Sequence, residues 1–204
     1  MYEWLLFGHL LGVAVMLSGL GVHMVSVERL RHARMVSELR MLLAAAKYGE
    51  RMVLGGSALL VAAGITMAAR FWSFADAWIA ASIGLVIAQG LAGSVIVDRR
   101  MKRLRAALES APDGALSTDM TVLARDPLLH AGSRIAVPII VEILFLMTVK
   151  PSVRGILWSL LTAAGLGTLV VWPAFARRSG PRAFTEEEAS EDADPVEGGS
   201  IKGR

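Results

Sequence analysis

Five long apolar stretches, separated by short charged segments, dominate the pattern of this chain. The first covers residues 4–27 and contains no charged side chain. About 20 apolar residues in a helix are enough to cross a hydrocarbon core about 30 Å thick. The pattern therefore predicts an all-α, polytopic membrane bundle with five transmembrane helices. We expect these spans at about residues 4–27, 52–72, 77–97, 131–149 and 153–175.

The polar segments between the apolar stretches differ in character. Residues 28–51 are basic and their leucines recur at helical spacing, which predicts an amphipathic helix on the membrane surface or an extension of the first helix into the cytoplasm. Residues 98–130 break near Pro112 and Gly114, and we expect a short helix at about 118–125. Residues 179–204 are acidic and hold few apolar side chains. We expect a bundle domain over residues 1–178, followed by a disordered acidic tail.

The positions of lysine and arginine predict the orientation of the bundle. Basic residues gather in residues 28–51, in residues 98–130 and after the fifth span, whereas the other connections hold only Arg70, Lys150 and Arg154. Cytoplasmic loops of membrane proteins carry the excess of basic residues. We therefore expect the N-terminus outside, the C-terminus in the cytoplasm, and a multi-pass location in the bacterial cytoplasmic membrane.

Composition excludes one class of protein and several kinds of site. Because 54% of the residues are hydrophobic and the charges lie in blocks, the chain is not an ordinary soluble domain. The chain has no cysteine, which excludes disulfides, thiolate metal sites and cysteine nucleophiles. A copper pathway would need clustered Met and His, and only Met16, His23 and Met24 come close, so we predict no metal site. No catalytic motif stands out, so no catalytic residue is predicted.

The first apolar stretch carries small residues on one side. On a helix, Gly8, Gly12, Gly19 and Ser26 lie within about 40° of one another. Small residues allow the backbones of neighbouring membrane helices to approach closely. This side is therefore predicted to pack against protein, and the opposite side against lipid.

His9 and His23 lie on the same helix, about 21 Å apart along its axis. This offset is typical of membrane cytochromes that hold one haem near each face. No second helix carries a matching pair, so the haem alternative is a single haem b with His9 or His23 as an axial ligand. The plainer interpretation, which we favour, is that both histidines form hydrogen bonds to a neighbouring helix.

Three further polar residues lie in the predicted spans: Gln89, Arg134 and Glu142. A carboxylate in a membrane is costly unless it is protonated, paired or beside water. Glu142 is therefore either a functional residue or a neutral or histidine-paired group that fixes helix packing. His9 lies at a similar depth and is its expected partner.

A dense basic segment follows the third span and contains Arg99, Arg100, Lys102, Arg103 and Arg105. Binding of anionic lipid headgroups is enough to explain it. No nucleic-acid motif accompanies the charge, so we expect membrane lipids as partners and no nucleic acid.

Several short motifs resemble a family of bacterial integral membrane proteins of unknown function. They are the opening Tyr2-xx-Leu5-xx-Gly8-His9-Leu10-Leu11-Gly12, the segment Asp98-Arg99-Arg100-Met101-Lys102-Arg103-Leu104, and the ending Met147-Thr148-Val149-Lys150-Pro151. That family looks distantly similar to copper-resistance D-type domains and to membrane protoporphyrinogen-oxidase J-type proteins. The resemblance covers about residues 1–172 and implies a small helical bundle with a haem or metal link through His9. The fifth span departs from the pattern.

Two functional classes remain open. The first is a non-enzymatic membrane protein that serves as an accessory or structural subunit and packs into a larger membrane assembly with other subunits. It would need no cofactor. The second is a haem b-binding redox protein or an enzyme similar to porphyrinogen oxidases that uses His9 and His23. We favour the first class, because the glycine-rich faces of the spans suit contacts between helices.

Overall fold

The computed structural model describes residues 1–176, and these residues are helical apart from short turns and one isolated bridge between Met35 and Ala115. The helices are α1 (Tyr2–Leu30), α2 (Val36–Phe71), α3 (Ala77–Ala92), the π-helix η1 (Gly93–Asp98), α4 (Arg99–Glu109), α5 (Thr118–Ala124), α6 (Pro127–Val149) and α7 (Val153–Ala176). Five helical stretches are long and apolar enough to cross a membrane. The predicted all-α bundle with five spans is confirmed. The predicted tail, residues 179–204, lies outside the described residues.

Helix α2 is far longer than the second predicted span. Its 36 residues extend about 54 Å at 1.5 Å per residue, whereas the hydrocarbon core is about 30 Å thick. The Glu38 carboxylate starts the helix by accepting hydrogen bonds from the backbone N–H groups of Arg34 (2.9 Å) and Met35 (3.3 Å). These two bonds lower the pKa of Glu38, which lies outside the predicted spans.

The prediction for residues 28–51 was therefore wrong in both of its forms. Helix α1 ends at Leu30, and most of the segment forms the first turns of α2 instead of a surface helix or an extension of α1. The leucine spacing reflects real burial, since Leu39 and Leu43 are buried. They pack within a protein core and not on lipid.

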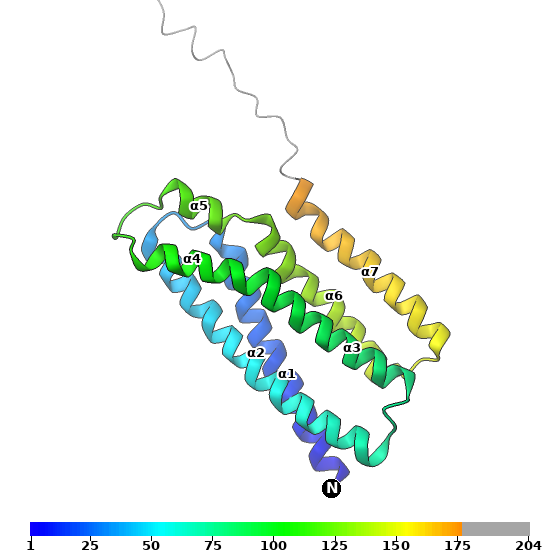
Figure 1. The fold of residues 1–204 in the computed structure, drawn as a ribbon. Helices are drawn as coiled ribbons and strands as arrows, with labels where there is room; N and C mark the ends of the chain where they lie inside the picture. Colours follow the sequence, from blue (N-terminus) through cyan, green and yellow to red (C-terminus); the bar gives the residue numbers. More distant parts are fainter. Residues whose placement is uncertain (177–204) are drawn as a thin grey trace, which may run out of the picture.

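Helices α3, η1 and α4 follow one another without a break and form one helical stretch, Ala77–Glu109. Figure 1 shows this stretch as a single inclined rod from the α2–α3 turn to the α5 end of the molecule. The apolar part is α3 with most of η1, and the basic part is α4. The expected short helix near 118–125 is α5.

Helix α6 begins where the Asp126 carboxylate accepts a hydrogen bond from the backbone N–H of Leu128 (2.9 Å), with Pro127 in the first turn. It ends at Val149, and the φ of 50° at the following Lys150 lies in the left-handed region. The Lys150 ammonium lies 3.8 Å from the ring centre of Trp72, at the end of α2. This cation–π contact ties the α6–α7 connection to the α2–α3 connection.

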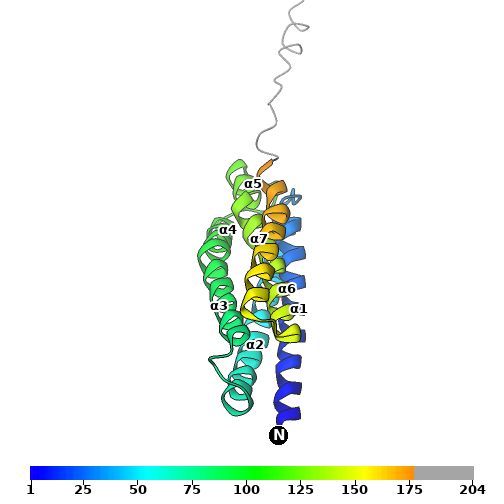
Figure 2. The same ribbon diagram turned by 90° about the vertical axis from the view of Figure 1, so that its right-hand side faces the viewer.

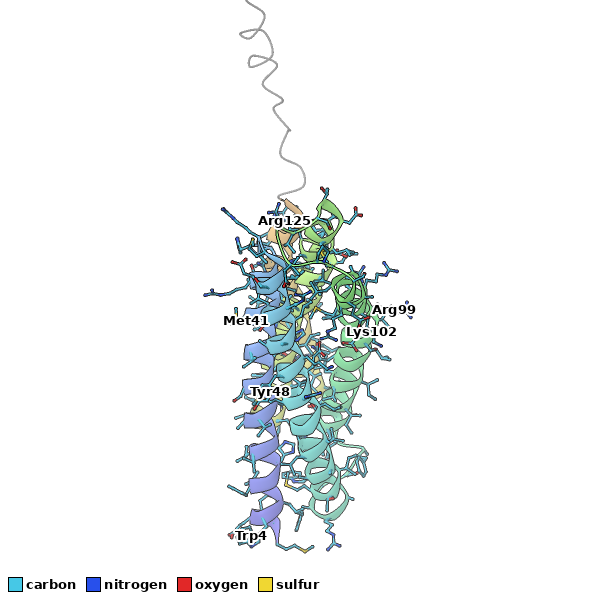
Figure 3. All side chains as sticks on the ribbon, turned by 90° about the vertical axis from the view of Figure 1, so that its left-hand side faces the viewer. Trp4, Met41, Tyr48, Arg99, Lys102 and Arg125 are labelled. Atoms are coloured by element: carbon cyan, nitrogen blue, oxygen red, sulfur yellow. The ribbon has the colours of Figure 1, made fainter. Side chains whose placement is uncertain are left out.

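The two ends of the bundle differ in charge. Figure 3 shows Arg99, Lys102 and Arg125 toward one end and Trp4 at the other. We call the end formed by α4, α5 and the adjoining ends of α1, α2 and α6 the basic end. Figures 1 and 2 show the N-terminus at the opposite end, and α7 alongside α6 at the side of the bundle.

The main hydrophobic core lies at the basic end, and most of its members lie outside the predicted spans. It joins the end of α1, the start of α2, α4, α5 and the start of α6, and its buried members include Leu30, Leu39, Met101, Leu104 and Leu129. In the spans, by contrast, many large apolar side chains are exposed, such as Leu54 at 72% and Leu161 at 65%. Lipid is the natural environment of these faces.

Candidate functional site

Helices α1 and α2 meet backbone to backbone at two glycine pairs. A Cβ atom added to Gly12 would lie 2.8 Å from the Gly56 carbonyl oxygen, and one added to Gly19 would lie 2.8 Å from the Gly49 carbonyl oxygen. A side chain at either position would therefore overlap the partner helix. Gly8 differs, because its nearest neighbour would be the Ala63 Cβ at 3.9 Å. The small side of α1 thus contacts α2 at Gly12 and Gly19 and has ordinary spacing at Gly8.

The two histidines of α1 both face α2. His9 Nδ1 lies 3.0 Å from the Leu60 carbonyl oxygen, and His23 Nδ1 lies 3.4 Å from the Ala46 carbonyl oxygen. A carbonyl can only accept, so each bond requires a proton on Nδ1 and leaves Nε2 with the lone pair in the neutral ring. Gly64 lies against the His9 ring, where its missing side chain makes room.

Glu142 is paired with a hydroxyl, and not with His9 as predicted. The side chain is 5% exposed, and Ser159 Oγ on α7 donates a hydrogen bond to its Oε1 atom at 2.6 Å. His9 instead bonds α2. Equal depth in the membrane does not make two residues neighbours, because it says nothing of which helices are adjacent. The Glu142–Ser159 bond joins α6 to α7.

Gln89 and Arg134 have different surroundings. Gln89 lies on α3, and its Oε1 atom is buried with no hydrogen-bond partner among the described residues. Arg134 lies in the second turn of α6, and its Nη2 atom donates to Glu28 Oε1 at 2.8 Å. The sequence-predicted polar residues therefore do not converge on one site.

A group of charged residues at the basic end surrounds Glu28. The Glu28 carboxylate receives hydrogen bonds from Arg31 (3.0 Å) and Arg134 (2.8 Å), and His130 Nδ1 lies 3.8 Å from its Oε2 atom. Glu28 comes from the end of α1, whereas His130 and Arg134 come from the start of α6. One carboxylate thus links α1 and α6 at the basic end.

His130, which precedes the fourth predicted span, is 3% exposed. Its Nε2 atom lies 3.0 Å from the Ala124 carbonyl oxygen and must carry the proton, so the neutral ring has its lone pair on Nδ1, facing Glu28. Burial lowers the pKa of His130, and the positive charges of Arg31 and Arg134 act in the same direction. The Ala124 hydrogen bond and Glu28 oppose this shift. The neutral ring therefore fits this site.

A second carboxylate, Glu50 on α2, links α1 and α4. Arg105 Nη2 donates to Glu50 Oε1 at 2.7 Å, and His23 Nδ1 lies 3.9 Å from the same oxygen. Sequence reasoning missed Glu28, Glu50 and His130. Their positions in the sequence could have identified them. Each lies at the boundary between an apolar stretch and a basic segment, where a single acid or histidine can interact with several arginines.

In the basic segment predicted to bind headgroups, some residues form ion pairs within the protein and others do not. Arg100 Nε donates to Asp126 Oδ2 at 3.0 Å, and Arg105 pairs with Glu50. Arg99, Lys102 and Arg103 are exposed and form no ion pair with other described residues. Among residues 1–176, no three His, Asp or Glu side chains group in a way that could hold a metal ion.

Comparison with protein families identifies the chain at a general level. The model of the family described as "Predicted integral membrane protein (DUF2269)" matches residues 3–151, which run from α1 to the end of α6. The chain belongs to this family. Membership in the DUF2269 family establishes an integral membrane protein and assigns no activity. No curated protein and no solved structure matches the chain. The more distant likeness to copper-resistance D-type and protoporphyrinogen-oxidase J-type proteins stays a prediction.

Proposed function

We propose that this protein is a non-catalytic accessory subunit of a larger membrane assembly, and that α3 provides the surface for a partner helix. The observation that carries the proposal is an exposed row of small residues on α3: Ala80, Gly84 and Ala88. A Cβ atom added to Gly84 would meet nothing within 4 Å. The row has the four-residue spacing through which membrane helices approach closely.

The α1–α2 contact supports this interpretation from within the same molecule. There, glycines of one helix face the backbone of the other, and a Cβ atom added to Gly56 would lie only 2.5 Å from the Met16 nitrogen. On α3, Gly84 has no such neighbour. A partner helix could pack against Gly84 as α1 packs against Gly56.

Replacing Gly84 with Leu tests the proposal. The side chain has free space in the isolated protein, so folding should be unchanged, whereas a partner helix should be displaced. Gly165→Leu is the matched control, because Gly165 on α7 is also exposed and also has nothing within 4 Å. Blue-native electrophoresis of mild detergent extracts from the native host should show an assembly larger than the single chain for the parent and for Gly165→Leu. Gly84→Leu should run as the single chain.

A parent protein that runs as a single chain would contradict the proposal. Equal retention of the assembly by both leucine variants would also contradict it, since the α3 row would then have no role. Thermal unfolding of both variants in detergent shows that any loss of assembly does not come from a folding defect.

The orientation belongs to the same proposal: the basic end faces the cytoplasm, in a bacterial cytoplasmic membrane. The gathering of α4, α5 and the start of α2 at one end supports it. Because the chain has no cysteine, single cysteines at Ser73 and Ser110 give clean labelling sites near opposite ends. An impermeant reagent added to intact cells should label Ser73→Cys and leave Ser110→Cys unlabelled. The reverse pattern would invert the topology.

Haem b binding is the second candidate, and the hydrogen bond of His9 favours it. Nδ1 bonded to the Leu60 carbonyl is the arrangement in which histidine offers Nε2 to a metal. His9 or His23 could therefore serve as an axial ligand through Nε2. A Soret band in protein produced with adequate haem, lost in His9→Ala or His23→Ala, would establish this function. A colourless parent protein would exclude it.

A further inference from the structure

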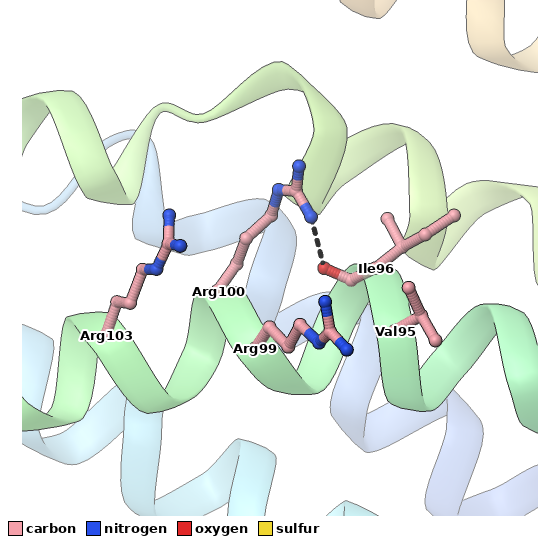
Figure 4. Close-up of a pocket in the computed structure, with 5 residues that line it drawn as sticks. All are labelled: Val95, Ile96, Arg99, Arg100 and Arg103. Carbon is pink, nitrogen blue, oxygen red and sulfur yellow. Dashed lines mark hydrogen bonds between the residues drawn. The ribbon is translucent and has the colours of Figure 1, made fainter.

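A cavity of about 330 Å³ lies where η1 passes into α4 and is lined by Val95, Ile96, Arg99, Arg100 and Arg103. Its position is a boundary: Val95 and Ile96 belong to the third span, and the arginines belong to the basic segment that follows. Figure 4 shows Arg99 and Arg100 reaching back along the helix toward Val95 and Ile96, with Arg103 one turn further on. Apolar groups and guanidinium groups therefore share one small site.

The charges of this site are not balanced within the described residues. Arg100 is held by two bonds, since its Nε donates to Asp126 (3.0 Å) and its Nη1 donates to the Ile96 carbonyl (2.8 Å). Arg99 and Arg103 have no acidic partner in residues 1–176 and stand four residues apart on one face of the helix. Two like charges at this spacing repel each other. A bound anion would offset this uncompensated charge.

The backbone geometry next to the cavity also indicates a binding site, because it departs from a regular α-helix. Residues Gly93–Asp98 form a π-helix between two α-helical stretches. Such insertions are rare and occur frequently at functional sites, because they change the direction of the side chains that follow. Here the π-helix contains Val95 and Ile96, and the arginines of the cavity follow directly after it.

We propose that this cavity binds the phosphate of an anionic phospholipid headgroup. Guanidinium groups match phosphate oxygens in paired hydrogen bonds. The volume is at the small end of the range of about 300–1,000 Å³ for ligand sites, which suits a headgroup and not a whole lipid. The exposed side chains of Leu91 and Val95 continue from the cavity toward the membrane interior, where the acyl chains belong. The same arginines could also bind free inorganic phosphate, so the test compares the phospholipid with inorganic phosphate.

The test uses the full-length protein, delipidated in neutral detergent, and native mass spectrometry to count bound ligand. The probes are short-chain phosphatidylglycerol, short-chain phosphatidylcholine and inorganic phosphate. The parent should bind phosphatidylglycerol more tightly than phosphatidylcholine, and inorganic phosphate should not displace it. Arg99→Gln combined with Arg103→Gln should weaken phosphatidylglycerol binding by about tenfold or more, because charge-assisted bonds to the phosphate are lost.

Arg29→Gln combined with Lys102→Gln is the matched control. It removes the same charge from exposed positions near the basic end that do not line the cavity, and it should weaken binding by about twofold at most. Arg99→Lys with Arg103→Lys keeps the charge and loses the paired geometry, so its affinity should fall between parent and glutamine variant. This variant also serves if the glutamine variant fails to fold.

Three results would overturn the proposal. Equal weakening by the control pair would show that general surface charge attracts the lipid. Displacement by inorganic phosphate would assign the cavity to a free anion. A parent that does not distinguish phosphatidylglycerol from phosphatidylcholine would show that no anionic headgroup site exists.

Discussion

The basic end and the membrane spans of this protein are held together by different interactions. At the basic end, large apolar side chains such as Leu39, Met101 and Leu104 are excluded from solvent, and arginine–carboxylate pairs surround them. In the spans, α1 and α2 meet through glycines and many large apolar side chains face outward. The hydrophobic effect buries apolar side chains that would otherwise contact water, but it does not act on side chains that would otherwise contact lipid. Large buried side chains therefore hold the basic end together, whereas small residues hold α1 and α2 together in the spans.

The largest expected effect comes from removing bulk at the basic end. Leu39→Ala should lower the free energy of unfolding by about 2–5 kcal/mol, because it leaves a cavity at a side chain with 0% exposure. Leu54→Ala is the control on the same helix, since Leu54 is 72% exposed and faces away from the core. Unfolding by denaturant in mild detergent measures both. If both variants lose the same free energy of unfolding, the buried side chains of the basic end do not form a stabilising hydrophobic core.

Adding bulk in the spans should give the next largest effect. Gly56→Ala should lower the free energy of unfolding by about 1–3 kcal/mol, because the new Cβ would lie 2.5 Å from the Met16 nitrogen. Gly55→Ala is the neighbouring control, where the Cβ meets nothing within 4 Å. If the two variants unfold alike in detergent, α1 and α2 do not pack through this face.

A smaller effect should follow from removing the partner of Glu142. Ser159→Ala deletes the hydroxyl that donates to the carboxyl oxygen at 2.6 Å, and should cost about 0.5–2 kcal/mol in stability. Thr162→Ala is the control, since that exposed hydroxyl bonds only the Trp158 carbonyl one turn earlier in α7. Thermal unfolding in detergent compares them. If Ser159→Ala loses no more thermal stability than Thr162→Ala, the Glu142–Ser159 bond does not stabilise the contact between α6 and α7.

The smallest expected effect concerns pH. Because burial lowers the pKa of His130 below its usual 6.5, the unfolded chain binds the proton more readily than the folded one. The stabilisation is present above pH 6.5 and is lost as the pH falls through the folded-state pKa. His130→Gln should flatten this part of the stability profile, whereas the same change at the exposed His32 should leave it unaltered. A parallel profile for parent and His130→Gln would contradict this role.

Periodicity and hydropathy predicted the helical elements well, because each depends on neighbours in the sequence. The projection of α1 placed Gly12 and Gly19 on one side, and the structure brings that side against α2. Pairings between distant segments could not be predicted. Glu28 meets Arg134, 106 residues away, and Glu142 meets Ser159 and not His9. The spacing of Leu39 and Leu43 indicated a buried face, but could not show that protein, and not lipid, would cover it.

The composition of the basic-end core also determines when it can form during synthesis. Its members come from two blocks of the chain, residues 27–46 and 97–129. The α1–α2 hairpin needs only the residues of these two helices and can form as soon as they have left the ribosome. The first block must then wait, with Leu30 and Leu39 uncovered, until about fifty further residues, including the whole of α3, have been translated. The nascent protein therefore carries an unfinished apolar surface on the basic side of its first hairpin, which closes only when α4 and α5 arrive.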